Sequence, residues 1–210
     1  MQKLIVVGNT KGGCGKSTLV MALTAEAERR QQKVIIVDAD PTSVLKFWAS
    51  IRGIECKHVA STLNISDYLT TLKNENNDAL ILVDTGGFDS KAARSALTAK
   101  CTDIVVFPVK TSPIDLFVVR QFLKDALPYI KHTNPLAVLM EADHLKSATD
   151  DILSAKKVLE GFGVKPLNNF TVKRKVYREN FTRGGDHLAN IKARNEVSLI
   201  YDELMGDLNG

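Results

Sequence analysis

The chain has 210 residues, of which 44% are hydrophobic, 25% charged and 6% aromatic, which excludes an intrinsically disordered protein. We expect residues 1–210 to form a single domain, and no apolar run approaches the ~18 residues that a membrane-spanning helix needs. The formal net charge is +4, and the positive charge is concentrated late in the chain.

Apolar runs rich in Val and Ile alternate with stretches of helical period, which is typical of βαβ units around a parallel sheet. In chain order, we predict strands at 3–8, 33–38, 55–59, 79–84, 103–109 and 135–140. Helices are predicted at 16–30, 43–51, 66–72, 90–99, 114–130, 147–161 and 187–205. The predicted fold class is α/β, with a mostly parallel central β-sheet flanked by helices on both faces.

The cysteines and the N-terminal residues bear on the compartment. Cys14, Cys56 and Cys101 are odd in number and widely spaced, which suits neither a disulfide framework nor a zinc site. Residues 1–8 lack the apolar core and the cleavage site of a secretory signal. We therefore expect a protein of the reducing cytoplasm.

The most informative stretch lies between the first predicted strand and the first predicted helix. Its glycines allow the backbone to wrap around a phosphate, with amide groups at a helix N-terminus as donors. Lys16 supplies a positive charge, and the Ser17 hydroxyl is placed to coordinate Mg²⁺. The predicted nucleotide-binding residues are Lys11, Gly12, Gly13, Cys14, Gly15, Lys16, Ser17 and Thr18.

This loop departs from the ordinary phosphate-loop pattern, because Thr10 stands where the first glycine is usual and Lys11 follows it. The string Lys-Gly-Gly-x-Gly-Lys-Ser resembles the deviant Walker A motif of the ParA/MinD family of ATPases, and the short chain is most like the small ParA type. The resemblance implies a P-loop NTPase with ATP and Mg²⁺ as cofactors. It also implies an ATP-bound homodimer in which Lys11 reaches the nucleotide of the partner subunit.

Three aspartates follow predicted strands, where a parallel sheet binds its ligands. Asp38 and Asp40 belong to an Asp-Ala-Asp-Pro segment, and Asp84 ends a buried run before Thr85-Gly86-Gly87. By resemblance, Asp40 orients the attacking water, Asp38 holds magnesium-bound solvent, and Asp84 lies in a Walker B motif followed by a switch segment. The predicted catalytic residues are Lys11, Lys16 and Asp40, and the predicted metal-site residues are Ser17, Asp38 and Asp84.

Two further positions keep alternatives open. Asp115 belongs either to the periphery of a dimer or nucleotide site, or to the polar groups that stabilise a helix N-terminus. Glu141 and Ala142 stand where many relatives carry Asn or Arg near the base, which leaves adenine recognition undecided.

The basic residues gather in segment 165–194, which has 8 Lys+Arg against 2 Asp+Glu, or +6. Arg174 and Tyr177 resemble an Arg-x-x-Tyr pair on the DNA-binding surface of relatives. The resemblance implies binding to DNA phosphates without sequence preference, and the alternative is a solvated or dimer-facing charged patch. The predicted DNA-binding residues are Lys173, Arg174, Lys175, Arg178, Arg183, Lys192 and Arg194.

The resemblance implies an ATPase that dimerises on ATP binding, binds nucleoid DNA and drives segregation or positioning of plasmid or chromosomal DNA or another cargo. A ParB-like adaptor stimulates hydrolysis in this hypothesis, and the protein is cytoplasmic and nucleoid-associated. The alternative is an ATP-dependent metabolic synthetase of the same fold. A membrane-cycling relative is disfavoured because the C-terminal segment carries Glu196, Asp202, Glu203 and Asp207, which anionic lipid repels.

Overall fold

The computed structural model describes residues 2–9, 11–59, 64–86, 91–130, 132–143, 148–179 and 184–206. Its strands form one sheet in the order β3-β2-β4-β1-β5-β6-β7, and every pairing is parallel. The strands are β1 (Lys3–Val7), β2 (Val34–Ala39), β3 (Cys56–His58), β4 (Leu80–Thr85), β5 (Ile104–Val109), β6 (Asn134–Leu139) and β7 (Lys165–Pro166).

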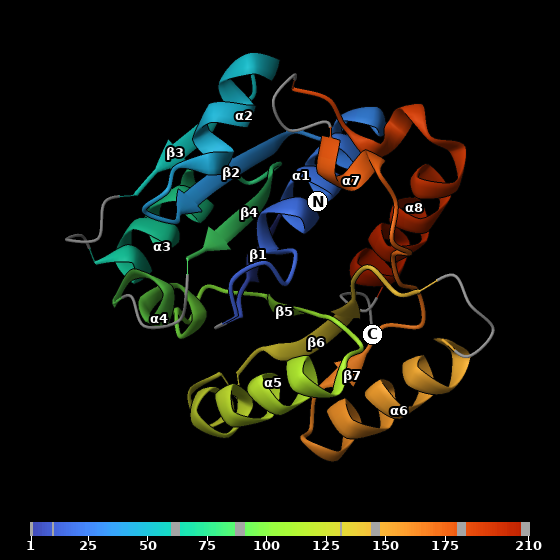
Figure 1. Ribbon diagram of the computed structural model, residues 1–210. Helices are drawn as coiled ribbons and strands as arrows, with labels where there is room; N and C mark the ends of the chain where they lie inside the picture. The colour runs from blue at the N-terminus through green and yellow to red at the C-terminus, as the bar shows by residue number, and fades with distance from the viewer. Residues whose placement is uncertain are drawn as a thin grey trace.

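Helices cover both faces of this sheet (Figure 1). One face packs against α1 (Lys16–Arg29), α2 (Val44–Arg52) and α8 (Ile191–Gly206). The other face packs against α3 (Ile65–Glu75), α4 (Lys91–Leu97), α5 (Pro113–Ala126) and α6 (Ala148–Gly161). Three short helices complete the described chain: η1 (Leu127–Tyr129), α7 (Val176–Glu179) and η3 (His187–Ala189). The predicted fold class is therefore confirmed.

Strand β1 shows why continuous apolar runs form the centre of the sheet. All five of its residues are buried. Its side chains alternate between the faces, with Leu4 and Val6 in one core and Ile5 and Val7 in the other. A central parallel strand needs apolar residues on both sides, because helices cover both.

The differences from the predicted elements are local. Predicted helix 114–130 ends as α5 at Ala126 and continues as η1, which has Pro128 in its first turn, because a proline nitrogen has no hydrogen for the α-helical bond. Predicted helix 187–205 is divided into η3 and α8. β7 and α7 were not predicted, since two and four residues are too few to establish a period.

Within the described ranges, no helix is long and apolar enough to cross a membrane.

Candidate functional site

The carboxyl ends of three neighbouring strands meet at one edge of the sheet. β4 lies between β1 and β2, and the register sets Asp84 beside Val7 on one side and beside Asp38 on the other. Residues 11–15 leave this edge and lead into α1. The sheet therefore brings the glycine-rich loop and two buried carboxylates together, as the sequence predicted.

The loop depends on glycines at two positions. Gly13 and Gly15 have φ values of 72° and 104°, which L side chains rarely adopt. A Cβ at Gly15 would also lie 3.2 Å from Cε of Met140. The Lys16 ammonium donates to the backbone oxygen of Lys11 at 3.1 Å, so the lysine side chain folds back over the loop. Thr10 lies outside the described residues.

Ser17 and Asp84 form the centre of the site. The Ser17 hydroxyl donates to Oδ2 of Asp84 at 2.6 Å, whereas Oδ1 of Asp84 is buried without a hydrogen-bond partner in the described part of the chain. Burial raises the pKa of Asp84 to about 7, although the Ser17 hydrogen bond opposes this shift. A buried carboxylate oxygen without a donor is suited to a divalent cation.

Mg²⁺ suits a site with few protein ligands. The described residues contain no group of three or more His, Cys, Asp or Glu side chains that could hold a metal. Mg²⁺ does not need such a group, because water and substrate phosphates supply most of its ligands. The donor set of this site therefore fits Mg²⁺.

Asp38 organises the turn that carries Asp40. The Asp38 carboxylate is fully buried and accepts from the amides of Asp40 at 3.1 Å and Lys46 at 3.0 Å, and burial raises the pKa of Asp38. Oδ1 of Asp40 accepts from the amide and hydroxyl of Thr42, both at 2.8 Å. A Cβ at Gly86 would lie 3.6 Å from Cγ of Asp40, so the predicted switch segment begins directly beside Asp40.

Lys11 is held within its own chain by an ion pair with Asp115. The lysine side chain keeps 34% of its exposure and the aspartate 9%. Burial alone raises the pKa of Asp115, but hydrogen bonds from Lys11 and Ser112 outweigh it and lower the pKa. The N-cap of α5 is Ser112, whose hydroxyl oxygen accepts from the Asp115 amide at 3.2 Å. The Asp115 carboxylate therefore belongs to the periphery of the loop.

Residues 5–198 match the family model described as the CobQ/CobB/MinD/ParA nucleotide binding domain. The chain belongs to this family. Its loop, Asp-x-Asp segment and strand-end aspartate occur at one edge of a parallel sheet, and the ParA/MinD resemblance seen in the sequence is confirmed.

This CobQ/CobB/MinD/ParA domain is also similar to individual proteins in sequence or in fold. It is 29% identical over 187 residues to the "Maintenance of carboxysome distribution protein A" of Halothiobacillus neapolitanus, covering 86% of this chain and 84% of the relative. The fold resembles the MinD cell division protein of Aquifex aeolicus, with a TM-score of 0.75, 17% identity and 97% of each chain covered. It also resembles pNOB8 ParA bound to non-specific DNA, with a TM-score of 0.66, 15% identity and coverage of 99% and 100%.

Asn9 supports the loop of this ParA/MinD domain, although the sequence pattern did not single it out. Asn9 is 1% exposed, donates from its amide to the Pro108 oxygen at 2.8 Å and accepts from the Lys11 amide at 3.2 Å. It thereby ties the start of the loop to β5. The only signal in the sequence was a polar residue just after an apolar strand.

The predicted DNA-binding residues differ in their surroundings. Arg174 is turned inward, because its guanidinium pairs with Glu196 of α8, with 2.9 Å between Nε and Oε1. Tyr177 donates to the same carboxylate at 2.9 Å. The Lys175 ammonium lies 2.9 Å from Glu179 and stays 81% exposed. Lys173, Arg178, Lys192 and Arg194 are also exposed, and Arg183 lies outside the described residues.

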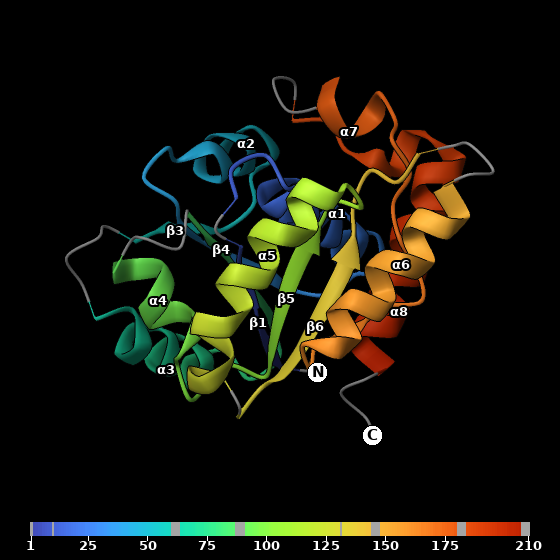
Figure 2. The ribbon, with the colours of Figure 1, turned by 60° about the horizontal axis from the view of Figure 1, so that its bottom comes forward.

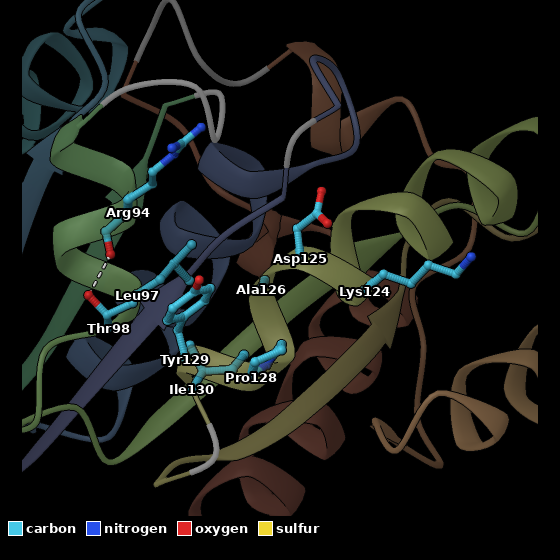
Figure 3. Close-up of a pocket in the computed structure, with 9 residues that line it drawn as sticks. All are labelled: Arg94, Leu97, Thr98, Lys124, Asp125, Ala126, Pro128, Tyr129 and Ile130. Atoms are coloured by element: carbon cyan, nitrogen blue, oxygen red, sulfur yellow. Dashed lines mark hydrogen bonds between the residues drawn. The ribbon is translucent and has the colours of Figure 1, made fainter.

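A separate cavity of about 590 Å³ lies between the C-terminal parts of α4 and α5 (Figure 3). Buried Leu97, Ala126 and Ile130 contribute apolar surface, and Arg94 and Lys124 stand on opposite sides. None of the predicted nucleotide-site residues lines it. This cavity is therefore not part of the phosphate-binding site.

Proposed function

We propose that this chain is a ParA-type ATPase that acts as a single domain. It binds ATP with Mg²⁺, dimerises, binds DNA without sequence preference and positions plasmid DNA, chromosomal DNA or another cargo. A ParB-like adaptor stimulates its hydrolysis. The observation that carries the proposal is the Ser17–Asp84 pair, whose free carboxylate oxygen (Oδ1) is buried beside a loop that carries Lys11 and Lys16.

Binding of the nucleotide uses main-chain groups first. The amides of residues 12–18 lie at the N-terminus of α1, where the helix dipole favours an anion. Lys16 exchanges its hydrogen bond to the Lys11 oxygen for the phosphates. Ser17 and Asp84 would hold Mg²⁺, and Asp38 would contact its bound water. When bound, Mg²⁺ neutralises charge that develops on the transferred phosphoryl group.

Hydrolysis is assigned to Asp40. The turn held by Asp38 fixes the Asp40 backbone, and the Thr42 hydrogen bonds orient its carboxylate. A carboxylate oriented in this way can position a water molecule for attack and accept its proton. Gly86, which belongs to the predicted switch segment, lies against this turn, since a Cβ there would be 3.2 Å from Cδ of Pro41.

The proposal of a dimer rests on the position of Lys11. Its side chain is 34% exposed, and the ammonium would leave Asp115 to reach a nucleotide held by a second copy. Because each copy then supplies a cation to the other's phosphates, ATP binding and pairing are linked.

DNA binding, positioning and a nucleoid-associated, cytoplasmic location are proposed from the surface charge and from the relatives. Exposed Lys173, Lys175, Arg178, Lys192 and Arg194 can neutralise phosphates. Structures that resemble this chain include a ParA bound to non-specific DNA, and a relative maintains carboxysome distribution, as its name says.

The direct test compares Asp40→Ala with Asp40→Asn, which keeps an acceptor for the Thr42 amide. Both variants should bind ATP·Mg²⁺ close to wild type, whereas hydrolysis should fall about 100- to 10,000-fold, as measured by phosphate release with DNA and adaptor present. Both should also remain on DNA after ATP is added. Normal turnover in both variants would remove Asp40 from this role.

A further inference from the structure

Two further hollows continue the cavity between α4 and α5. The first, of about 280 Å³, shares Ile130 with that cavity and is also lined by Leu127 and Phe162. The second, of about 330 Å³, shares Pro135 and Gly163 with the first. The three hollows therefore follow one another in a row, which we call the amino-edge groove.

The amino-edge groove lies where the strands of the sheet begin. Thr98 comes before β5, Ile130 before β6 and Gly163 before β7. Figure 2 shows the C-terminal ends of α5 and α6 gathered at this edge with the start of β6. The glycine-rich loop leaves the opposite, carboxyl edge of the sheet. A molecule bound in the groove therefore leaves the nucleotide site open.

We propose that the amino-edge groove binds an extended segment of a partner protein that carries both apolar and acidic side chains. A single cavity of about 590 Å³ has the volume of a small-molecule site. A row of hollows instead suits a peptide chain, whose successive side chains can occupy successive pockets. The inference does not rest on the proposed function, because none of the predicted nucleotide-, metal- or DNA-binding residues lines the groove.

The walls of the amino-edge groove supply apolar surface on a stiff backbone. Leu97 and Ile130 are each 1% exposed, whereas Tyr129 beside them is 70% exposed. Pro128 and Pro135 also line the groove, and a proline ring fixes the backbone φ angle. Because this backbone needs little ordering when a ligand binds, the entropy cost that opposes docking is small.

The charges that line the amino-edge groove favour an acidic partner. Arg94 and Lys124 line the cavity at one end, and Lys165 lines the hollow at the other end. Among the described lining residues, the acidic side chain is that of Asp125 alone. Charges of opposite sign on the partner would speed association and fix its register. A nucleic acid would leave the apolar walls without partners, so a peptide with both kinds of side chain fits better.

The experiment selects binders to the full chain from a phage library of random peptides of about 12 residues, which span about 40 Å when extended. Enriched peptides should combine apolar residues with Asp or Glu. Fluorescein-labelled synthetic copies should bind wild type, as measured by fluorescence anisotropy. Their affinity should fall about tenfold or more for Arg94→Glu/Lys124→Glu. Thr98→Trp, which adds bulk at an exposed lining position without changing the charge, should give a similar loss.

The matched control is Lys33→Glu/Lys157→Glu, which changes the net charge equally at two exposed lysines outside the groove. It should bind the peptides within about twofold of wild type. Urea unfolding checks that each variant is folded, and if one groove variant does not fold, the other decides.

Three results would overturn the inference: no peptide is enriched, the enriched peptides lack acidic residues, or the folded groove variants bind them as tightly as wild type. Displacement of the peptides by a DNA oligonucleotide would also overturn it, because the groove would then be a phosphate-binding surface. Each of these results leaves the proposed function unchanged, since that function is tested through Asp40.

Discussion

The two ends of α1 bury carboxylates in opposite ways. At its N-terminal end, Asp84 has one oxygen without a partner, and burial raises its pKa to about 7. At its C-terminal end, Glu26 is equally buried, but Arg29 donates to it at 2.6 and 2.8 Å and Arg30 at 2.8 Å. Burial of Glu26 is outweighed by these bonds and one from Ser198, so its pKa falls to about 2.

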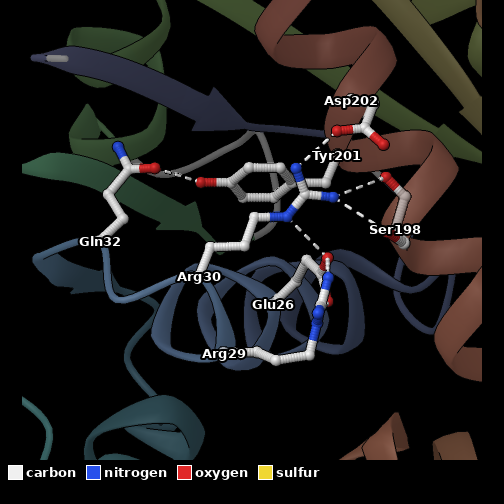
Figure 4. Close-up of polar contacts among 7 residues, drawn as sticks. All are labelled: Glu26, Arg29, Arg30, Gln32, Ser198, Tyr201 and Asp202. Carbon is white, nitrogen blue, oxygen red and sulfur yellow. Dashed lines mark hydrogen bonds and ion pairs between the residues drawn. The ribbon is translucent and has the colours of Figure 1, made fainter.

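The two ends of α1 differ in whether the chain itself supplies the hydrogen-bond partners of the buried carboxylate. The Glu26 contacts form a seam between α1 and α8 (Figure 4). In this seam Arg30 also pairs with Asp202 at 2.5 Å and stacks on Tyr201, with 4.6 Å from Cζ to the ring centre. In the seam, residues of the chain pair every oxygen of the Glu26 carboxylate. At the other end, Oδ1 of Asp84 is left for a ligand to pair. The carboxylate at the C-terminal end of α1 is therefore fully paired, whereas the carboxylate at the N-terminal end is available to a ligand.

The largest expected loss of stability comes from opening the seam with Glu26→Gln. The substitution replaces the carboxylate by a neutral amide, so Arg29 and Arg30 lose their charged partner. Both arginines remain partly exposed to water. We expect a loss of about 2 to 3 kcal/mol in unfolding free energy, measured by urea unfolding at pH 7. Glu28→Gln is the control, since Glu28 is 35% exposed in its pair with Arg52, and it should cost under about 1 kcal/mol. Equal losses would mean that the seam is no stronger than a surface pair.

A third way to bury a titratable group occurs beside the seam. His187 is 3% exposed and neither ring nitrogen has a partner within the described chain. Burial lowers its pKa to about 4, against the pull of Asp186 and Glu26 and with help from Arg29 and Arg52.

Acid should therefore weaken the fold through His187. Its folded pKa of about 4 lies below the unfolded value near 6.5, so the unfolded chain binds the extra proton first. Stability is complete above about pH 6.5 and falls as the pH drops toward 4, by about 2 kcal/mol between pH 7.5 and 5. His187→Leu should lose this part of the pH dependence in urea unfolding, and His132→Gln should keep it. An unchanged slope in His187→Leu would assign the acid sensitivity elsewhere.

The smallest expected stability change is a gain, from Asp84→Asn. Removing a buried charge that lacks a full set of donors should raise the unfolding free energy by about 1 kcal/mol at pH 8 without ligands. The same change should weaken Mg²⁺-dependent nucleotide binding about 100-fold, measured by calorimetry. Asp78→Asn is the control, because the Asp78 side chain is 74% exposed. A loss of stability in Asp84→Asn would contradict the contrast between the two ends of α1.

The sequence predicted most of the fold and the components of the candidate site. Buried strands such as β1 and β4 reveal themselves as continuous apolar runs, and the glycine-rich loop has a fixed spacing of residue types. The strand ends then place Asp38 and Asp84 together, because parallel strands share one carboxyl edge.

The pairings of charged side chains could not be predicted in the same way. Asp115 lies 104 positions from Lys11, and Glu196 lies 22 positions from Arg174. No local period links such residues, so Arg174 was counted with the surface cations although it supports α8. Trp48 is the opposite case, because it lies on a local apolar stripe of α2 with Leu45 and both are fully buried.

The seam also has a consequence for biosynthesis. Arg30 and Asp202 are separated by 172 positions, so the contacts that complete α1 form only after the last turns of α8 have left the ribosome. The glycine-rich loop is translated before α8, so α1 lacks this packing partner until α8 has emerged. A nascent chain therefore completes the packing behind its glycine-rich loop only after α8 has been translated.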